Sequence, residues 1–431
     1  MLRYVLIGLA AFAIVGWIGY VNFDPFASLE PPTSTISALP GEREWAMFRR
    51  DPAHTGADVH GGSVPYGEVM WQFRAREPIR SSPALVDGRV YIGTGDHRVV
   101  ALEARTGETV WEHEATGPVD WSVAVAGGMV FLGLRDARVL ALDVDTGDVR
   151  WEYRTRGPIH GSPAVDRGEL YVGSDDFGIY ALDAMTGEER WVYRTGGRVT
   201  SSPAANEDVV AVTSEDKYLY VLDRTTGRPR LDFQLTTGSG SPALTGSYVL
   251  AIDGLGRLTA IDWRKDDKPF EKLVTRVGLQ LFAWGILDDV PNQRGFEWSY
   301  QPVGDNLVGE PAVASGTVYV SGASGVMYAL DLATGRPIWE FRAESSLERS
   351  PSAWADFVYL ADSGGILYTI DARTGAKLWQ VDIGGPATAS PVIAGGELYV
   401  TSTDGGLTAI FTPYYIGPNR YPSPSGHRHS Q

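Results

Sequence analysis

A tryptophan recurs about every 40 residues along this chain, and this period limits the fold more than any other feature of the sequence. In the copy that ends at Trp151, the tryptophan follows an Ala141-Leu142-Asp143 triplet and a Thr146-Gly147 pair. The tryptophans that keep this phase are Trp111, Trp151, Trp191, Trp298, Trp339 and Trp379. A repeat of roughly 40 residues that holds several short strands is typical of a β-propeller blade.

A second marker, a Ser-Pro pair usually followed by Ala, repeats in the same phase. Its strong copies begin at Ser82, Ser162, Ser202, Ser241, Ser350 and Ser390, and its weaker copies begin at Ser122 and Glu310. These eight copies predict an all-β, eight-bladed propeller. In each blade we expect strand A to begin at the Ser-Pro pair and strand B to follow as an aromatic and Val-rich run. Strand C then ends in the Ala-Leu-Asp triplet, and strand D carries the tryptophan.

Trp71 is a spare copy, because no Thr-Gly pair precedes it. The last repeat ends with its strand C, Leu407 to Phe411, and has no tryptophan strand after it. We therefore expect the strand around Trp71 to be the outer strand of the eighth blade. This pairing would close the ring with the two ends of the chain and leave no open sheet edge.

The repeat pattern resembles the quinoprotein-like propeller superfamily, in which tryptophan docking motifs join neighbouring blades. The resemblance covers Trp45 to Phe411 and includes a lead-in from Trp45 to Gly56 that is similar to the lead-in of many members. It implies that the tryptophans are packing anchors and not ligand-binding groups. The docking tryptophans are Trp71, Trp111, Trp151, Trp191, Trp298, Trp339 and Trp379.

In such a propeller the D–A and B–C loops meet at one mouth of the central channel, and the A–B and C–D loops meet at the other. The positions just before strand A should form a ring at the first mouth: Arg80, Asp120, His160, Thr200, Ser239, Val308, Glu348 and Thr388. The resemblance implies that quinoprotein dehydrogenases hold calcium, pyrroloquinoline quinone (PQQ), a catalytic Asp and an Arg or Lys at this mouth, with the quinone stacked on a tryptophan. The candidates for such a site in this chain are Arg80, Asp120, Trp121, His160 and Glu348.

These candidates do not match the dehydrogenase pattern residue by residue, so we assign no catalytic residue, no metal site and no cofactor. A polar mouth whose charges satisfy one another is the interpretation we favour, and PQQ with calcium is the alternative. The absence of Cys excludes disulfides and a C-x-x-C-H haem site. The net charge of −16 argues against a nucleic-acid partner, which needs clustered Lys and Arg.

The first residues predict a membrane anchor. Tyr4–Val21 is uncharged and almost wholly apolar, and a helix of this length spans about 27 Å, close to the hydrocarbon thickness of a bilayer. Arg3 precedes the segment and Asp24 follows it, so the positive-inside rule puts the propeller outside the cytoplasm. A cleaved signal peptide is the competing interpretation. The expected domains are an anchor (1–22), a linker and lead-in (23–66), the propeller (67–411) and a C-terminal tail (412–431).

The fifth blade departs from the repeat, because an insertion at 264–297 replaces its short C–D turn. Phe270, Leu273, Val274, Val277, Leu281 and Trp284 fall at helical spacing on one stripe, which we expect to pack on the propeller. Further apolar residues lie outside that stripe and would need a second partner: Leu279, Phe282, Ile286 and Leu287. The sequence thus predicts a helical insertion that contacts the membrane or a membrane-embedded partner, with a simple cap on the propeller as the alternative.

Three classes of function fit these features. The chain is similar to the propeller subunit of the outer-membrane β-barrel assembly machinery, which implies a non-enzymatic, protein-binding scaffold or assembly factor in the cell envelope. The alternatives are a PQQ-dependent dehydrogenase of alcohols or sugars and a small-ligand binding module. We favour the scaffold, held at the cytoplasmic (inner) membrane by a single span and with a protein partner in the envelope.

Overall fold

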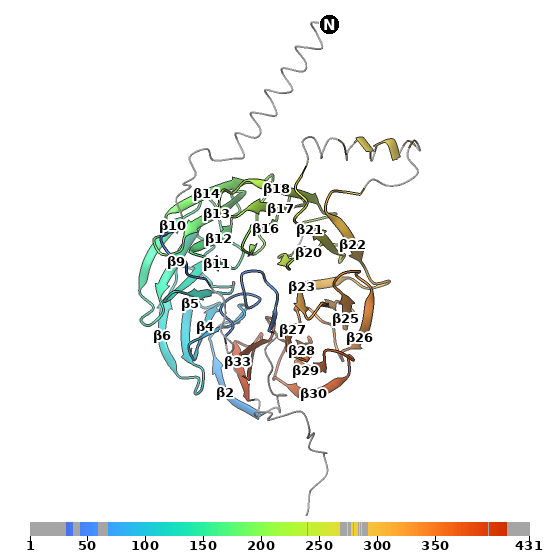
Figure 1. Ribbon diagram of the computed structural model, residues 1–431. Helices are drawn as coiled ribbons and strands as arrows, with labels where there is room; N and C mark the ends of the chain where they lie inside the picture. The colour runs from blue at the N-terminus through green and yellow to red at the C-terminus, as the bar shows by residue number, and fades with distance from the viewer. Residues whose placement is uncertain are drawn as a thin grey trace, which may run out of the picture.

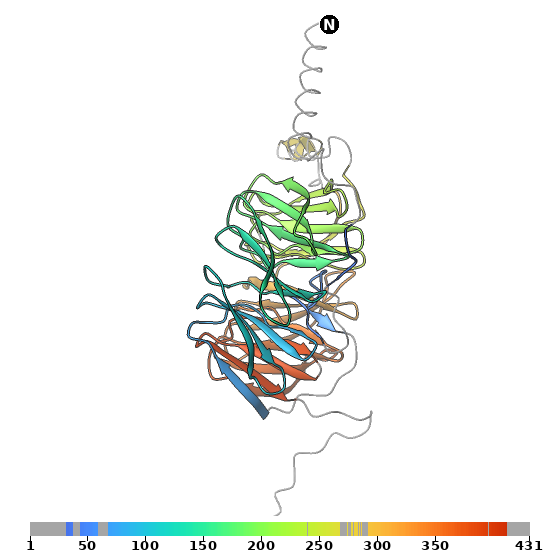
Figure 2. The ribbon, with the colours of Figure 1, turned by 90° about the vertical axis from the view of Figure 1, so that its left-hand side faces the viewer.

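The computed structural model of this protein describes residues 32–37, 44–58, 68–238, 240–267, 274, 277, 278, 280–282, 284, 286, 292–394 and 396–411. The strands of these residues form eight sheets around a central channel (Figure 1). Seen from the side, the ring is a flattened body (Figure 2). This arrangement confirms the prediction of an all-β, eight-bladed propeller.

Each blade runs from an inner strand A at the channel to an outer strand D at the rim. Blades one and two contain β3 (Ala84–Val86), β4 (Arg89–Thr94), β5 (Arg98–Glu103), β6 (Thr109–Glu114), β7 (Ala124–Ala126), β8 (Met129–Gly133), β9 (Arg138–Asp143) and β10 (Val149–Arg154). Blades three and four contain β11 (Ala164–Asp166), β12 (Glu169–Gly173), β13 (Gly178–Asp183), β14 (Glu189–Arg194), β15 (Ala204–Ala205), β16 (Val209–Thr213), β17 (Tyr218–Asp223) and β18 (Pro229–Gln234).

The remaining four blades follow in chain order. Blades five and six contain β19 (Ala243–Leu244), β20 (Tyr248–Ile252), β21 (Leu258–Asp262), β22 (Phe296–Tyr300), β23 (Leu307–Ala314), β24 (Thr317–Gly322), β25 (Val326–Asp331) and β26 (Pro337–Arg342). Blades seven and eight contain β27 (Ser352–Trp354), β28 (Phe357–Ala361), β29 (Ile366–Asp371), β30 (Lys377–Asp382), β31 (Val392–Ala394), β32 (Glu397–Thr401) and β33 (Gly406–Phe411).

The burial of each strand follows from its place in the blade. The middle strands β12 and β13 are buried along their whole length, because neighbouring blades cover both of their faces. The outer strand β10 alternates between exposed and half-buried residues, because only one of its faces meets the next blade. The cores of the protein therefore lie between the blades.

The eighth blade is closed by the N-terminal part of the chain. Strand β2 (Glu68–Arg74) pairs antiparallel with β33, with Trp71 opposite Ala409 and Arg74 opposite Gly406. The expected closure by the strand around Trp71 is confirmed. The pairing covers the last open edge of the ring with a strand from the other end of the sequence.

The Asp and Thr-Gly residues of the repeat build the turn between strands C and D. In blade two, the Asp143 carboxylate accepts hydrogen bonds from the backbone N–H groups of Asp145 and Thr146, both at 2.9 Å. Gly147 follows with a φ of 76°, a conformation that disfavours other residues. A Cβ on Gly147 would lie 2.6 Å from the Trp111 ring of the previous blade, so the glycine also makes room for that indole.

The indole of one blade also donates a hydrogen bond to the C–D turn of the next. The bonds are Trp71 to Ala104 O (2.8 Å), Trp111 to Val144 O (2.9 Å), Trp151 to Ala184 O (3.1 Å), Trp191 to Arg224 O (2.8 Å), Trp298 to Leu332 O (3.0 Å) and Trp339 to Ala372 O (2.9 Å). No such bond of Trp379 is found among the described residues. Each bond spans a blade boundary, so it ties the packing of one blade to the turn of its neighbour.

The two irregularities of the repeat lie next to each other and depend on each other. Blade four carries Leu231 where the other blades carry tryptophan, and blade five carries the insertion where the others have a Thr-Gly turn. Leu231 is buried and packs near Gly295, at the end of that insertion. Because the insertion removes the turn that an indole would dock on, the smaller leucine fills the space in blade four.

The lead-in fills the inside of the channel. Its backbone bonds in turn to inner strands of six blades: Trp45 to Leu85, Ala46 to Val125, Pro52 to Ala205, Ala53 to Leu244, Thr55 to Val313 and Gly56 to Ala353, at 2.6–3.0 Å. The two residues that follow it form β1 (Ala57–Asp58), which pairs parallel with β27. The sequence identified this segment only by resemblance and did not predict that it enters the channel.

The predicted helices have different outcomes. No helix in the described ranges is both long and apolar enough to cross a bilayer, and Tyr4–Val21 lies outside these ranges. In the insertion, the described residues between Val274 and Phe282 are helical. However, Val274, Val277 and Trp284 are exposed, so the expectation that their stripe packs on the propeller is wrong for these residues. Leu279 and Leu287 lie outside the described residues.

Removal of a docked indole should destabilise the ring. Trp191 is only 1% exposed, so we expect Trp191→Ala to lower the free energy of unfolding by about 3–5 kcal/mol. Trp284→Ala, at an exposed tryptophan, is the matched control and should change it by less than about 0.5 kcal/mol. Urea unfolding followed by circular dichroism measures both. Equal effects of the two substitutions would contradict the docking role.

Candidate functional site

The serines of the Ser-Pro pairs form a chain of hydrogen bonds around the channel. The N–H of each serine donates to the hydroxyl of the serine in the next blade: Ser82 to Ser122 (2.9 Å), Ser122 to Ser162 (3.0 Å), Ser162 to Ser202 (2.9 Å) and Ser202 to Ser241 (3.0 Å). Because proline has no N–H, the serine supplies the donor that begins each inner strand. This chain fixes where the residues just before strand A are placed.

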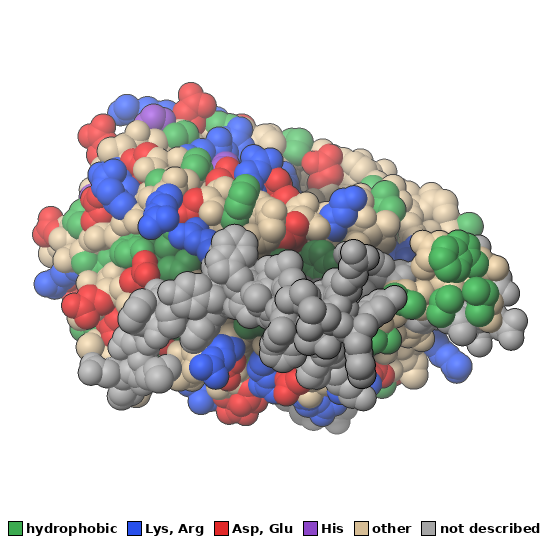
Figure 3. Space-filling view, turned by 90° about the horizontal axis from the view of Figure 1, so that it is seen from above, with side chains coloured by type: hydrophobic (Ala, Val, Ile, Leu, Met, Phe, Trp, Pro, Cys, Tyr) green, Lys and Arg blue, Asp and Glu red, His purple; other side chains and the backbone are tan. Residues whose placement is uncertain are grey.

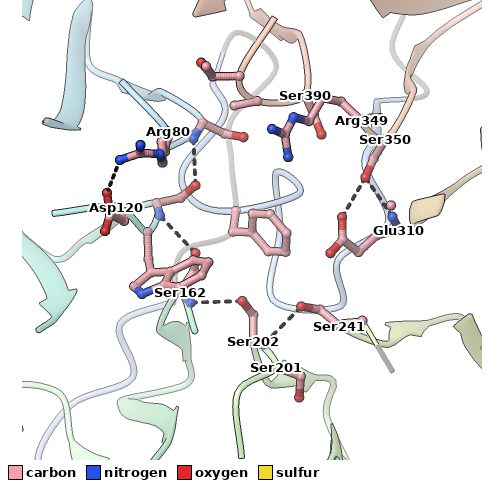
Figure 4. A pocket seen from close by; sticks show the side chains of 18 of the residues that line it. Arg80, Asp120, Ser162, Ser201, Ser202, Ser241, Glu310, Arg349, Ser350 and Ser390 are labelled. Atoms are coloured by element: carbon pink, nitrogen blue, oxygen red, sulfur yellow. Dashed lines mark hydrogen bonds and ion pairs between the residues drawn. The ribbon is translucent and has the colours of Figure 1, made fainter. Parts of the chain in front are cut away.

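A cavity of about 350 Å³ opens at this mouth (Figure 4). Phe48 of the lead-in lines it together with residues of the D–A loops and the serine chain. The lead-in bonds to Leu85 and Val125, which lie deeper along the inner strands than Ser82 and Ser122. The lead-in is therefore the floor of the cavity.

Asp120 is the centre of one charged group at the mouth. Its carboxylate accepts from Arg80 at 3.2 Å and from Arg135 at 2.8 Å, and its side chain is only 5% exposed. Both arginines are more than half exposed, so water reaches this group from the mouth. Two cations thus neutralise one buried carboxylate, and the sequence did not identify Arg135 as one of them.

His160 belongs to a second group on the neighbouring blades. Its Nε2 lies 3.3 Å from the Asp175 carboxylate, and Arg198 lies 3.7 Å from the same oxygen. Arg198 also contacts Glu215 at 2.8 Å. The Trp121 ring meets the His160 ring edge-on, with centroids 6.2 Å apart. The indole of Trp121, which makes this edge contact, lines the wall of the cavity.

The other side of the mouth carries Glu310, Glu348 and Arg349. Ser350 donates to the Glu310 carboxylate at 2.6 Å and accepts the Glu310 N–H at 2.7 Å, so Glu310 takes the place of a serine in the hydrogen-bond chain. Glu348 and Arg349 are exposed and line the cavity. Neither forms an ion pair with another described side chain. Figure 4 shows that Arg349 and Arg80 approach the cavity from different blades.

The structure brings all five sequence candidates to one cavity. Arg80, Asp120, Trp121, His160 and Glu348 line it, and the ring members Thr200 and Thr388 do so too. Val308 does not line the cavity, because β23 bulges and presents Gly309 and Glu310 instead. Ser239 lies outside the described residues. Apart from its place in the lead-in, nothing in the sequence identified Phe48 as part of the cavity floor.

The residues at the mouth do not fit a calcium ion. Calcium takes six to eight oxygen ligands at roughly 2.3–2.6 Å, and no group of three or more His, Asp or Glu side chains in the described ranges is placed to hold a metal. Asp120 and Asp175 are already paired with arginines. The calcium-bound quinone that the superfamily resemblance implies therefore has no ligand set among these residues.

Two buried side chains of the lead-in hold it in the channel. The Arg49 guanidinium donates to Pro351 O at 2.7 Å and to Pro311 O at 2.9 Å, and a His54 ring nitrogen lies 3.1 Å from Pro242 O. Burial lowers the pKa of Arg49 to about 10 and the pKa of His54 to about 3. His54 is therefore neutral in the folded protein at physiological pH, and the two side chains satisfy carbonyls that the inner strands leave unpaired.

The sequence matches a known family over most of its length. The family model described as outer membrane protein assembly factor BamB matches residues 53–153, 98–280 and 284–412. The chain belongs to the BamB family. The solved BamB of Moraxella catarrhalis superposes with a TM-score of 0.61 at 17% identity, which covers 82% of this chain and all of that one.

Redox enzymes share the fold of the BamB family. Quinohemoprotein alcohol dehydrogenase of Comamonas testosteroni superposes with a TM-score of 0.67 at 16% identity, covering 91% of this chain and 84% of that one.

Among curated proteins, quinohemoprotein alcohol dehydrogenase ADH-IIG of Pseudomonas putida is 31% identical over 124 residues, 27% of this chain and 16% of the enzyme. Lupanine 17-hydroxylase [cytochrome c] of Pseudomonas sp is 39% identical over 59 residues, 14% of this chain and 8% of the enzyme. The chain thus spans only a small part of these curated relatives, and the structural matches show the fold alone.

The buried His54 makes stability depend on pH. The unfolded chain takes up a proton at His54 near pH 6.5, whereas the folded protein does not do so until about pH 3. The stability that comes from keeping His54 neutral is therefore fully present above pH 6.5, and it is lost as the pH falls toward 3. Between pH 7 and pH 5 the loss is about 2 kcal/mol. In His54→Gln, which keeps a donor for Pro242 O, the fall in unfolding free energy should be smaller by that amount. Chemical unfolding at both pH values measures it, and identical pH slopes would contradict the burial of a neutral imidazole.

Proposed function

We propose that this chain is a protein-binding scaffold or assembly factor of the cell envelope. In this proposal Tyr4–Val21 anchors it in the cytoplasmic (inner) membrane, and the propeller lies outside the cytoplasm. Membership of a family described as an outer membrane protein assembly factor supports the assembly role. Asp120 and Asp175 at the channel mouth are each paired with arginines, which supports a structural role for these two carboxylates rather than acid–base chemistry.

The observation that carries this proposal is an asymmetry in the B–C turns. At one position of these turns, blades five to eight have a glycine with positive φ: Gly256, Gly325, Gly365 and Gly405. Blades one to four have a residue with a side chain at the same position, also with positive φ: His97 (70°), Ala137 (70°), Phe177 (72°) and Lys217 (74°). Such a conformation costs roughly 1 kcal/mol or more for a residue other than glycine.

Phe177 is the most informative of these four residues. Its aromatic side chain is 45% exposed at the first mouth, although its backbone conformation is one that glycine would adopt without strain. An exposed aromatic at a strained position stabilises neither the turn nor the core. It is the kind of side chain that anchors a protein partner, because burial of its ring on binding recovers apolar area that the free protein leaves in water.

A quinone-dependent dehydrogenase is the second candidate. The observation that favours it is the cavity at the first mouth, where Trp121 offers a flat surface and Arg80 a cation, together with the one curated relative that is named an alcohol dehydrogenase. A small-ligand binding module would use the same cavity without chemistry. The lack of a calcium ligand set among the described residues makes the dehydrogenase less favourable than the scaffold.

Substitution of Phe177 tests the scaffold directly. We expect Phe177→Gly in the tagged, full-length chain to lower the amount of partner that co-purifies from detergent-solubilised membranes by at least about tenfold, as for an interface hot spot. The same change relieves backbone strain, so the unfolding free energy should stay equal or rise. Met185→Ala, at a residue 43% exposed in a C–D turn of the opposite mouth, is the matched control and should retain the partner. Full retention by the Phe177 variant would contradict the proposal.

Calorimetry distinguishes the scaffold from the dehydrogenase. We expect no saturable heat when PQQ and Ca²⁺ are added to the purified protein, and no dye-linked oxidation of alcohols or sugars, because the mouth offers no ligand set for the ion. Stoichiometric binding with turnover would replace the scaffold by the enzyme. In that case Arg80→Ala and Asp120→Asn should abolish the turnover.

A further inference from the structure

The C–D connection of blade five exposes a group of large apolar side chains, which we call the insertion cluster. It consists of Val274 (64% exposed), Val277 (48%), Phe282 (38%), Trp284 (67%) and Ile286 (63%). Figure 3 shows apolar side chains gathered at one end of the molecule, where the described part of the insertion projects beyond β21 and β22 in Figure 1. Five such side chains on one short segment are more than a soluble surface usually leaves to water.

The base of the insertion is fixed, although its cluster is not covered. Gln293 bonds twice to the backbone of Gln234 in β18, at 2.7 and 2.8 Å. On the outgoing side, the Asp267 N–H donates to Arg230 O at 2.7 Å, and the Asp267 carboxylate accepts from the Asp232 N–H at 3.1 Å. These bonds hold the insertion at the rim with polar contacts. The insertion cluster is therefore exposed at the end of an insertion whose base is held in place; we call this insertion the arm.

A second segment on the same side of the ring is the part of the linker that follows the predicted anchor. Thr33 bonds to the Asp183 carboxylate at 2.7–2.9 Å through its N–H and its hydroxyl, and the Ser37 hydroxyl donates to Asp166 at 2.7 Å. The N–H of Gly168 donates to Ile36 O at 2.6 Å. A Cβ on Gly168 would lie 2.0 Å from Ser34 O, so only glycine leaves room for this linker. Residues 32–37 are thus docked on the A–B and C–D turns of blade three.

The docked linker keeps this side of the ring near the predicted anchor. Val21 and Pro32 are eleven residues apart, and a fully extended chain of that length spans at most about 40 Å. The insertion is a C–D connection, so it leaves the ring on the same side as the turns that hold the linker. In Figure 1, β11 to β14 of blade three and the insertion also lie toward the same edge of the disc.

We propose that the insertion cluster lies in the interfacial region of the lipid bilayer that carries the N-terminal segment, so that the protein touches the membrane at two places. This inference rests on the anchoring proposed above. Trp284 combines a large apolar ring with an N–H donor, a chemistry that favours the boundary between headgroups and acyl chains. Phe282 in the helical part and Ile286 just after it supply apolar area of the kind that an interfacial helix buries to a depth of roughly 5–10 Å.

Two contacts would fix the orientation of the ring, which a single point of attachment cannot do. The linker holds blade three, and the insertion holds blade five, so the rim between them faces the lipid. The first mouth and Phe177 belong to the opposite set of loops and stay accessible to a partner. The proposal therefore gives the membrane and the partner separate surfaces of the propeller.

The absence of Cys from the chain allows a clean labelling experiment. Ile286→Cys is made in the full-length chain, labelled with the environment-sensitive fluorophore NBD and reconstituted into liposomes of phosphatidylcholine and phosphatidylglycerol. Val303→Cys is the matched control, because Val303 is fully exposed in the loop between β22 and β23 at the opposite mouth. Flotation of the liposomes first establishes that both labelled proteins are membrane-bound.

We expect the emission of the Ile286 label to shift to the blue on reconstitution and nitroxide-labelled acyl chains to quench it at least about twofold more than the Val303 label. Trp284→Asp in the Ile286→Cys protein should abolish both effects. Equal spectra at the two positions in floating liposomes would overturn the lipid contact while leaving the anchor and the scaffold standing. Failure of the protein to float would overturn the anchor and this proposal together. A blue shift seen only in native membranes and insensitive to the lipid quencher would assign the cluster to a protein partner instead.

Discussion

The docking of an indole on the glycine of the next blade is the contact on which this propeller depends. A side chain at Gly147 would collide with the Trp111 ring at 2.6 Å, and the same indole donates to Val144 O. The glycine is thus required twice, once for the left-handed turn and once for the close approach of the ring. Because every such contact joins two blades, no blade buries its faces alone. This dependence explains why a strand from the start of the chain must complete the eighth blade.

The exception in blade five shows how strict that contact is. Where the Thr-Gly turn is replaced by the insertion, the tryptophan of blade four is replaced by Leu231. An indole with no glycine turn to receive it would have to find other space or expose its ring, and the leucine avoids both. The insertion is therefore accommodated by a change in the neighbouring blade. The ring keeps its closure while it gains an arm at the rim.

The period of the tryptophans and Ser-Pro pairs was sufficient to predict the number of blades, the order of strands and the closure by Trp71. These features depend on local patterns that repeat in register. The channel could not be predicted in the same way, because Arg49 and His54 find their partners at Pro351 and Pro242, about 300 and 190 residues away. At the mouth, the ring of positions before strand A placed Asp120 and His160 correctly around one cavity. It missed Phe48, which lines the cavity from the lead-in, and Arg135, which pairs with Asp120 from another loop.

The two proposals made above assign different tasks to the two sets of loops. The lead-in lies in the channel and bonds to inner strands of six blades, which ties these blades together at the centre of the ring. Coupling between the mouths would have to travel through the closely packed blades, whose interfaces resist small displacements. The strained turn at Phe177 and the supported arm at Trp284 lie on opposite sets of loops. A rigid body can hold two such surfaces at a constant separation, and the proposed scaffold between a membrane and a partner would need this property.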